Sequence, residues 1–477
     1  MKKWMIRALS ALLIAAFLPL SVLADEYDLS QGSVTVSTSK GADGSTQQNV
    51  THKDNTRPDS NPTITSNGQQ TDNTITINAG AGTTANVTIK DANISASSGK
   101  AAIKTGGEGN VNLNVEGTNT VSSGDKHAGV EKSNGGKLTI GSENGEGKLI
   151  ANGGKYGAGI GGGDSGSGND ITITGGDIAA NGGEAGAGIG GGYDGGSSNI
   201  TVSGGEVTAT GGTNGAGIGG GGHGGNGSDI AITDGKVITT GGANGAGIGG
   251  GANGNGSNIT VSGGEVNASG SVAGAGIGGG LEGGVSGITI SGDAQVTARG
   301  GTGDSSVYEG AAIGYGGHQY GSFGPEVPPD TSGLYTTGKV ERIPGDGTVL
   351  DTITGTVEPP KPTEPEKSAS SEEEPDKREP LYRVLNLDGS TLKHQAQKAD
   401  GVLALTAKAD GAILTGTLRA LGYLQNQGIE KITFTDGTHS AELVLAELIA
   451  KGQPEDVYVL TLGAENTLTL NGEAIDF

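Results

Sequence analysis

The chain has 477 residues, a formal net charge of −23, 97 glycines and no cysteine. Without cysteine it has no disulfides, no zinc–thiolate sites and no thiol catalysis. So negative a chain is also a poor partner for nucleic acid, because like charges repel.

The first 24 residues have the composition of a Sec signal peptide. Three basic residues precede an apolar run over residues 8–23, and the small Ala24 is the expected cleavage site. Cleavage would take the net charge from −23 to −26 and remove the only tryptophan, Trp4. No later run of about 18 apolar residues could span a bilayer. We therefore expect an exported protein, secreted or on the extracellular cell surface, without a membrane span.

Residues 25–72 are rich in Ser, Thr, Asn, Gln and Asp and hold few large apolar side chains. This composition predicts a low-complexity leader, either disordered or a loose N-terminal cap. Alternating apolar residues begin at Thr74. Such period-2 runs at 74–77, 87–89, 111–115 and 138–140 predict short strands.

A heptapeptide, Gly-Ala-Gly-Ile-Gly-Gly-Gly, occurs five times between residues 157 and 280, and a degenerate sixth copy lies at 310–316. Its isoleucines are 29, 29, 30, 29 and 36 residues apart. A nearly fixed period predicts one structural unit stacked on copies of itself. Glycines beside the isoleucine would permit a corner with positive φ and close approach of the next coil. A phosphate-binding loop is the alternative, but no strand–loop–helix context surrounds the heptapeptide.

Each repeat also predicts three short strands, of the form Ala-Gly-Ile, Ile-x-(Ile/Val) and (Ile/Val)-x-(Ala/Thr). Stacking the repeats about 4.8 Å apart would form an inward ladder of Ile171, Ile200, Ile230, Ile259 and Ile288. The predicted fold is an all-β, right-handed parallel β-helix solenoid over residues 73–340, with 29–30-residue repeats at 157–316.

A Pro- and Glu-rich linker is expected at 341–380. A small α+β C-terminal domain is expected at 381–477, where Gly becomes rare and Leu common. Its expected strands are 381–387, 431–434, 457–462 and 467–470. One expected helix carries Leu414, Leu418, Leu421 and Leu424 on one face, and another spans 441–450 with Ser440 as its N-cap.

The segment 166–170, Gly-Ser-Gly-Asn-Asp, resembles the calcium-binding turn of nonapeptide β-rolls, although the period here is 29–30. One interpretation of Asp170 and its equivalents, Asn199, Asp229 and Asn258, is a ladder of side chains that cap a turn. The other is a calcium site, because hard cations prefer carboxylate and carbonyl oxygens. The candidate calcium ligands are Asp164, Asp170, Asp194 and Asp229.

Two other sets of residues are candidate sites. The outward column Asp177, Glu206, Lys236, Glu265 and Gln295 would offer paired carboxylates, but similar solvated environments favour surface charge over acid–base catalysis. We therefore predict no catalytic residue. The candidate sugar contacts are Tyr308, Tyr315 and Tyr320, which gather where the repeat degenerates. The alternative, which we favour, is that they cap the end of the solenoid.

Three segments, Gly-Thr-Asn-Thr-Val at 117–121, Ala-Gly-Val at 128–130 and Gly-Lys-Leu-Thr-Ile at 136–140, occur in an order similar to that of a known family. Over roughly residues 74–320 the chain resembles secreted bacterial parallel β-helix proteins of the carbohydrate-binding type, glycine-rich and adhesin-like. The resemblance implies an extracellular polysaccharide or cell-surface glycan as partner, acidic in character, with calcium assisting.

The expected function is non-catalytic polysaccharide binding or adhesion. One alternative is a structural cell-surface or matrix repeat protein with residues 381–477 as its interaction module. The other is a polysaccharide lyase, since lyases also use β-helices.

Overall fold

The computed structural model describes residues 25–304, 308–318, 325–358 and 382–475, apart from residues 43, 144, 388–389, 391, 400, 410, 427–428, 453–455, 464–465 and 472. The chain divides into two compact units, residues 1–362 and 363–477. The expected signal peptide and residues 359–380 of the expected linker lie outside the described residues.

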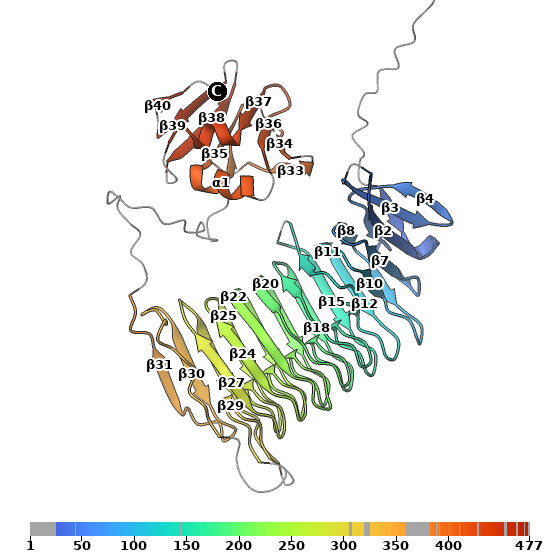
Figure 1. Ribbon diagram of the computed structural model, residues 1–477, viewed down its shortest axis with the longest axis vertical. Helices are drawn as coiled ribbons and strands as arrows, with labels where there is room; N and C mark the ends of the chain where they lie inside the picture. Colours follow the sequence, from blue (N-terminus) through green and yellow to red (C-terminus); the bar gives the residue numbers. More distant parts are fainter. Residues whose placement is uncertain are drawn as a thin grey trace, which may run out of the picture. The chain divides into compact units, whose positions relative to one another are not determined.

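The first unit is a parallel β-helix in which a typical coil contributes three short strands (Figure 1). In the coil of the first heptapeptide these are β16 (Ile160–Gly161), β17 (Ile171–Ile173) and β18 (Asp177–Asn181). On the next coil β16 pairs in parallel with β19 (Ile189–Gly190), whereas β17 and β18 both pair with β20 (Ile200–Thr210), which continues round the corner. The predicted β-helix with three strands per repeat is confirmed.

The other coils repeat this arrangement. Before β16 they contain β7 (Ile75–Ala79), β8 (Thr84–Lys90), β9 (Asn93–Ser95), β10 (Ile103–Gly107), β11 (Asn110–Glu116), β12 (Thr118–Ser122), β13 (Val130–Glu131), β14 (Leu138–Gly141) and β15 (Lys148–Asn152). After β20 they contain β21 (Ile218–Gly219), β22 (Gly227–Thr240), β23 (Ile248–Gly249), β24 (Gly256–Val261), β25 (Glu265–Ser269), β26 (Ile277–Gly278), β27 (Val285–Ile290), β28 (Gln295–Arg299) and β29 (Ile313–Gly314).

The core runs along the inside of the coils as ladders of aliphatic side chains. Ile171 pairs in register with Ile200, and the same ladder continues through Ile230, Ile259 and Ile288. All five are buried, as are the isoleucines of the six heptapeptide copies. The inward ladder predicted from the repeat is therefore confirmed.

The glycine after each heptapeptide isoleucine is required by the stacking. Gly219 has a φ of +136°, and a Cβ placed on it would lie 1.9 Å from the carbonyl oxygen of Gly249 on the next coil. Gly161 is in the same situation, with a φ of +135° and the Gly190 oxygen 2.0 Å away. A side chain there would need both a backbone conformation that L-residues avoid and space that the next coil occupies.

Of the two alternatives left open for residues 25–72, a disordered leader and an N-terminal cap, the structure shows a cap. These residues form β1 (Glu26–Asp28), the 3₁₀ turn η1 (Leu29–Gln31), β2 (Val34–Lys40), β3 (Thr46–His52), β4 (Asn55–Pro58), β5 (Thr63–Thr65) and β6 (Gln70–Thr71). β2 pairs in parallel with β7 and antiparallel with β3, so the segment is the first coil together with a cap. Its few apolar residues suffice because Tyr27, Val36 and Ile64 all point inward and are buried.

The other end of the solenoid is also covered. β30 (Lys339–Ile343) adds in parallel to β28, and β31 (Asp351–Thr354) pairs antiparallel with β30. The ordered structure thus extends to residue 358, into the segment expected to be linker. The side chain of Arg342, buried here, is paired with Asp351 and lies 3.5 Å from a carboxylate oxygen of Glu326.

The second unit contains a five-stranded sheet, β32-β35-β38-β39-β40, and a four-stranded sheet, β33-β34-β36-β37. Its elements are β32 (Arg383–Leu385), β33 (His394–Ala399), β34 (Val402–Ala407), β35 (Ala412–Thr417), α1 (Leu418–Asn426), β36 (Lys431–Thr435), β37 (Ser440–Val444), α2 (Leu445–Ile449), β38 (Val457–Leu462), β39 (Thr467–Leu470) and β40 (Glu473–Ala474).

Two expectations for this unit were wrong. Leu414 belongs to β35 rather than to the helix, because buried and partly exposed side chains alternate there as in a strand. Ser440 begins β37 instead of capping a helix, and the helix that follows is only five residues long. In the part of the chain that the structure describes, no helix is long and apolar enough to cross a bilayer.

Candidate functional site

The heptapeptide pattern is interrupted one coil before its first perfect copy. There Glu131 and Lys132 stand where the next coil has Gly161 and Gly162, as the pairing of Val130 with Ile160 and of Glu131 with Gly161 shows. The turn from Glu131 to the next strand, at Leu138, is also shorter: seven positions, against ten from Gly161 to Ile171. The turn therefore lengthens by three residues from the first of these coils to the second.

Glu131 is buried by its neighbours and holds two basic groups. Its carboxylate accepts hydrogen bonds from the Lys104 Nζ at 2.8 Å and from the His127 Nδ1 at 2.6 Å. Burial alone would raise the pKa of Glu131, but the hydrogen bonds from Lys104 and His127 outweigh it and the pKa is lowered. Glu131 is thus a buried, ionised carboxylate with its acceptors largely used.

Lys132 is the opposite case. Its side chain is 8% exposed, and its Nζ donates to the backbone oxygen of Asn134 at 2.6 Å. Among the described residues it makes no ion pair with a carboxylate within 4 Å. Burial lowers the pKa of Lys132, and the charge of Asp170 opposes this shift in part. An ammonium group has three donors, so this one retains capacity for a ligand oxygen.

A groove of about 700 Å³ lies at the step between the two coils. One side consists of Lys126, His127 and the segment 131–135, and the other of Gly163, Asp164, Gly166, Ser167, Asn169 and Asp170. Lys126 and Asp164 join across it, with the Nζ 3.2 Å from a carboxylate oxygen. The absence of a side chain at Gly163 keeps it open, since a Cβ there would lie 2.9 Å from a Glu131 carboxylate oxygen.

The charges around the groove nearly balance, unlike those of the whole chain. Three lysines, Lys104, Lys126 and Lys132, face three carboxylates, Glu131, Asp164 and Asp170. Two of the lysines are paired, which leaves Lys132 and Asp170 as the groups without an ion-pair partner within 4 Å among the described residues. Such a lining offers donors and acceptors for neutral polar groups without strong repulsion of anions.

The four predicted calcium ligands lie on three successive coils, with Asp164 and Asp170 on the first, Asp194 on the second and Asp229 on the third. Asp164 and Asp170 line the groove. An Asp170 oxygen accepts from the Asn199 Nδ2 at 3.0 Å, and an Asp229 oxygen accepts from the Asn258 Nδ2 at 3.1 Å. Asp170, Asp194 and Asp229 all have left-handed φ near +55°. The Asx ladder is therefore present, and no cluster of three or more His, Cys, Asp or Glu suited to a metal ion occurs among the described residues.

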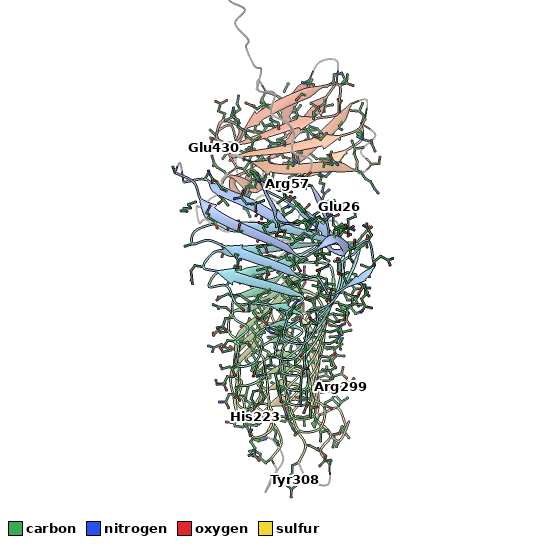
Figure 2. The ribbon with its side chains drawn as sticks, turned by 90° about the vertical axis from the view of Figure 1, so that its right-hand side faces the viewer. Glu26, Arg57, His223, Arg299, Tyr308 and Glu430 are labelled. Carbon is green, nitrogen blue, oxygen red and sulfur yellow. The ribbon has the colours of Figure 1, made fainter. Side chains whose placement is uncertain are left out.

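The predicted tyrosine patch is only partly described. Tyr308 and Tyr315 are exposed, at 41% and 36%, and Figure 2 shows Tyr308 on a loop that projects from the coils. Tyr320 lies outside the described residues. The outward column pairs in register as expected, and its charges form surface ion pairs such as Lys236 with Glu206 at 2.7 Å.

Sequence reasoning missed the groove because it searched for repeated features. Two signals were nevertheless present in the chain: the replacement of Gly-Gly by Glu131-Lys132 in an aligned column, and the turn that is three residues shorter than its successor. Both mark a departure from the repeat, and this departure places charged side chains where the regular coils have glycine.

Comparison with known proteins supports the fold. A family model described as a beta helix repeat matches residues 144–164, 171–193, 200–222 and 259–281, about a fifth of the chain. Searches of curated proteins and of solved structures gave no match.

Proposed function

We propose that this β-helix is an exported, non-catalytic polysaccharide-binding protein, and that the groove between the coils of Glu131 and Gly161 holds the glycan. The observation that carries the proposal is the replacement of the glycine pair by Glu131 and Lys132, which lines an open groove with polar side chains.

The chemistry of the groove fits a hydroxyl-rich ligand. Its volume of about 700 Å³ lies within the range of about 300–1,000 Å³ that is usual for ligand sites. Lys132 supplies donors, Asp170 supplies acceptor oxygens, and Asn134, Ser133 and Ser167 are neutral groups nearby. Sugars present alternating donors and acceptors, so a mixed lining of this kind satisfies them better than a lining of one charge.

Binding to a panel of glycans tests the proposal. Purified protein is applied to immobilised polygalacturonate, alginate, xylan, cellulose and chitin, with and without calcium, beside two variants. Lys132→Met keeps the apolar stem and removes the groove charge. Lys236→Met makes the same change on the exposed ion pair with Glu206, well away from the groove.

We expect at least one glycan to bind, Lys132→Met to weaken that binding by tenfold or more, and Lys236→Met to leave it unchanged. Thermal unfolding of both variants checks that they fold. If no glycan binds in either calcium condition, the proposal is wrong and a structural role for the repeat array becomes the better account. Release of unsaturated sugar ends from polygalacturonate would instead identify a lyase.

A further inference from the structure

A short row of aromatic rings follows the groove along the solenoid. The rings of Tyr156 and Tyr193 have centroids 5.3 Å apart and meet edge to face, and the ring of His223 lies 4.7 Å from that of Tyr193. The Nζ of Lys155 lies 5.3 Å from the centre of the Tyr156 ring. The two tyrosines are partly exposed and His223, which is labelled in Figure 2, is exposed. We call Tyr156, Tyr193 and His223 the aromatic ridge.

The ridge is continuous with the groove. Asp164, on the rim of the groove, and Tyr193 occupy equivalent positions after successive heptapeptides, and the Ser165 amide donates to the Tyr193 oxygen at 2.8 Å. The backbone amide at this position donates a hydrogen bond to a backbone oxygen on the previous coil. The acceptor is the residue directly before the heptapeptide of that previous coil. Asp164 donates to the Lys126 oxygen in this way, and Tyr193 donates to the Tyr156 oxygen. The aromatic ridge thus begins with Tyr156 on the coil that forms one side of the groove, and continues along the same edge to the next coils.

The aromatic residues are not required by the fold. Two coils further along, the position of Tyr193 is taken by Ala252 and then by Leu281, while the position of Tyr156 is taken by Asn214 and Asn244. The same backbone hydrogen bonds form there, with Ala252 donating to Asn214 and Leu281 to Asn244. The repeat tolerates small and polar residues at this edge, so the two tyrosines beside the groove do not follow from the architecture.

We propose that the aromatic ridge is a second sugar subsite, on which a pyranose unit with an apolar C–H face rests while the adjoining unit lies in the groove. This inference rests on the proposed function and adds two points to it. The glycan chain runs along the solenoid axis, and the sugar unit at the ridge presents an apolar C–H face rather than a charged group. Successive coils lie about 4.8 Å apart, a spacing close to the length of one sugar unit in an extended chain. Aromatic side chains suit this contact because they combine a large apolar surface with a polar tip.

Variants at the ridge separate this inference from the groove. Cellohexaose and chitohexaose, which have extended pyranose chains with exposed C–H faces, and polygalacturonate oligosaccharides serve as probes in calorimetric titrations of the whole protein. Tyr193→Ala removes the central ring, and Tyr193→Phe retains it without the hydroxyl group. Tyr308→Ala removes an exposed tyrosine that is outside the ridge.

For a probe that binds, Tyr193→Ala should raise Kd about tenfold, Tyr193→Phe should stay within about twofold of the wild type, and Tyr308→Ala should have no effect. Labelled Tyr and His ring resonances provide a second readout, in which Tyr156, Tyr193 and His223 shift on titration together with His127 of the groove. Thermal unfolding confirms that each variant is folded.

The remaining outcomes overturn one proposal or both. Loss of binding in Lys132→Met with no change in Tyr193→Ala, and resonance shifts confined to His127, would refute the subsite at the ridge. The proposed glycan site in the groove would stand. Loss in Tyr308→Ala alone would move the site to the end of the solenoid and overturn both. Failure of every probe to bind the wild type would likewise overturn both.

Discussion

Replacing Gly219 by alanine should open the solenoid at one coil. The residue has a φ of +136°, and its new Cβ would lie 1.9 Å from the Gly249 oxygen. Backbone strain of this kind costs about 1–3 kcal/mol. Relief of the clash would also break interstrand hydrogen bonds, such as that from the Gly220 amide to the Gly249 oxygen at 2.9 Å, at about 1 kcal/mol each. The expected loss in the free energy of unfolding is about 3–5 kcal/mol.

The matched control is Gly224→Ala, five residues along the same coil. Its φ is +94°, but a Cβ would meet no atom within 4 Å, so only backbone strain of about 1–2 kcal/mol applies. Urea unfolding followed by circular dichroism measures both variants. Because repeats couple mainly to their neighbours, amide exchange of Gly219→Ala should accelerate most at Ile218 and Ile248. Equal, small losses in the two variants would refute the argument that close coil contact selects glycine.

Three further predictions follow from the ends of the solenoid and from the second unit. Arg342→Ala leaves Glu326 and Asp351 without their buried partner and should cost about 3 kcal/mol in urea unfolding; a loss below 1 kcal/mol would show that the end cap does not depend on this cluster. Val36→Asp places a charge among buried residues and should speed amide exchange in β2 and β7 while leaving β28 protected, whereas uniform exchange would contradict local unfolding. In the second unit, hydrogen bonds from the backbone and side chain of His439, with smaller contributions from Thr438 and Gly411, overcome the effect of burial and lower the pKa of Asp436 from 3.8 to about 2. The resulting stability of about 2 kcal/mol is present above pH 3.8 and is lost as the pH falls through 2, and Asp436→Asn should flatten this dependence in acid unfolding curves.

The solenoid could be predicted from the sequence because its inward-facing apolar residues recur at a fixed spacing. A ladder such as Ile171–Ile200–Ile230 needs only alternation and a fixed spacing, and both are visible in one dimension. For the N-terminal segment the sequence left a disordered leader and a cap as alternatives, because composition counts apolar residues without regard to where they point. Tyr27 and Val36 both point inward and are buried, and the segment needs to cover only one end of the coil that follows it.

The candidate site was predictable only in part. Asp164 and Asp170 were predicted as calcium ligands rather than as parts of a groove, and the structure places both in its lining. Their partners come from Lys126 on the neighbouring coil and from Asn199 on the next. Such contacts depend on the register between coils and on the difference in turn length. An alignment of the repeats shows this difference only when the irregular coils are included. The aromatic ridge was out of reach for the same reason, since Tyr156 and Tyr193 are 37 residues apart in the chain.

The account depends most directly on where a glycan contacts the solenoid. Hydrogen exchange of the purified protein, measured with and without the oligosaccharide of the panel that binds most tightly, locates that contact. We predict slower exchange at residues 126–135 and 163–170, extending to 193 and 223, with no change at 308–318. Protection confined to residues 308–318, or no protection in the presence of saturating oligosaccharide, would contradict it.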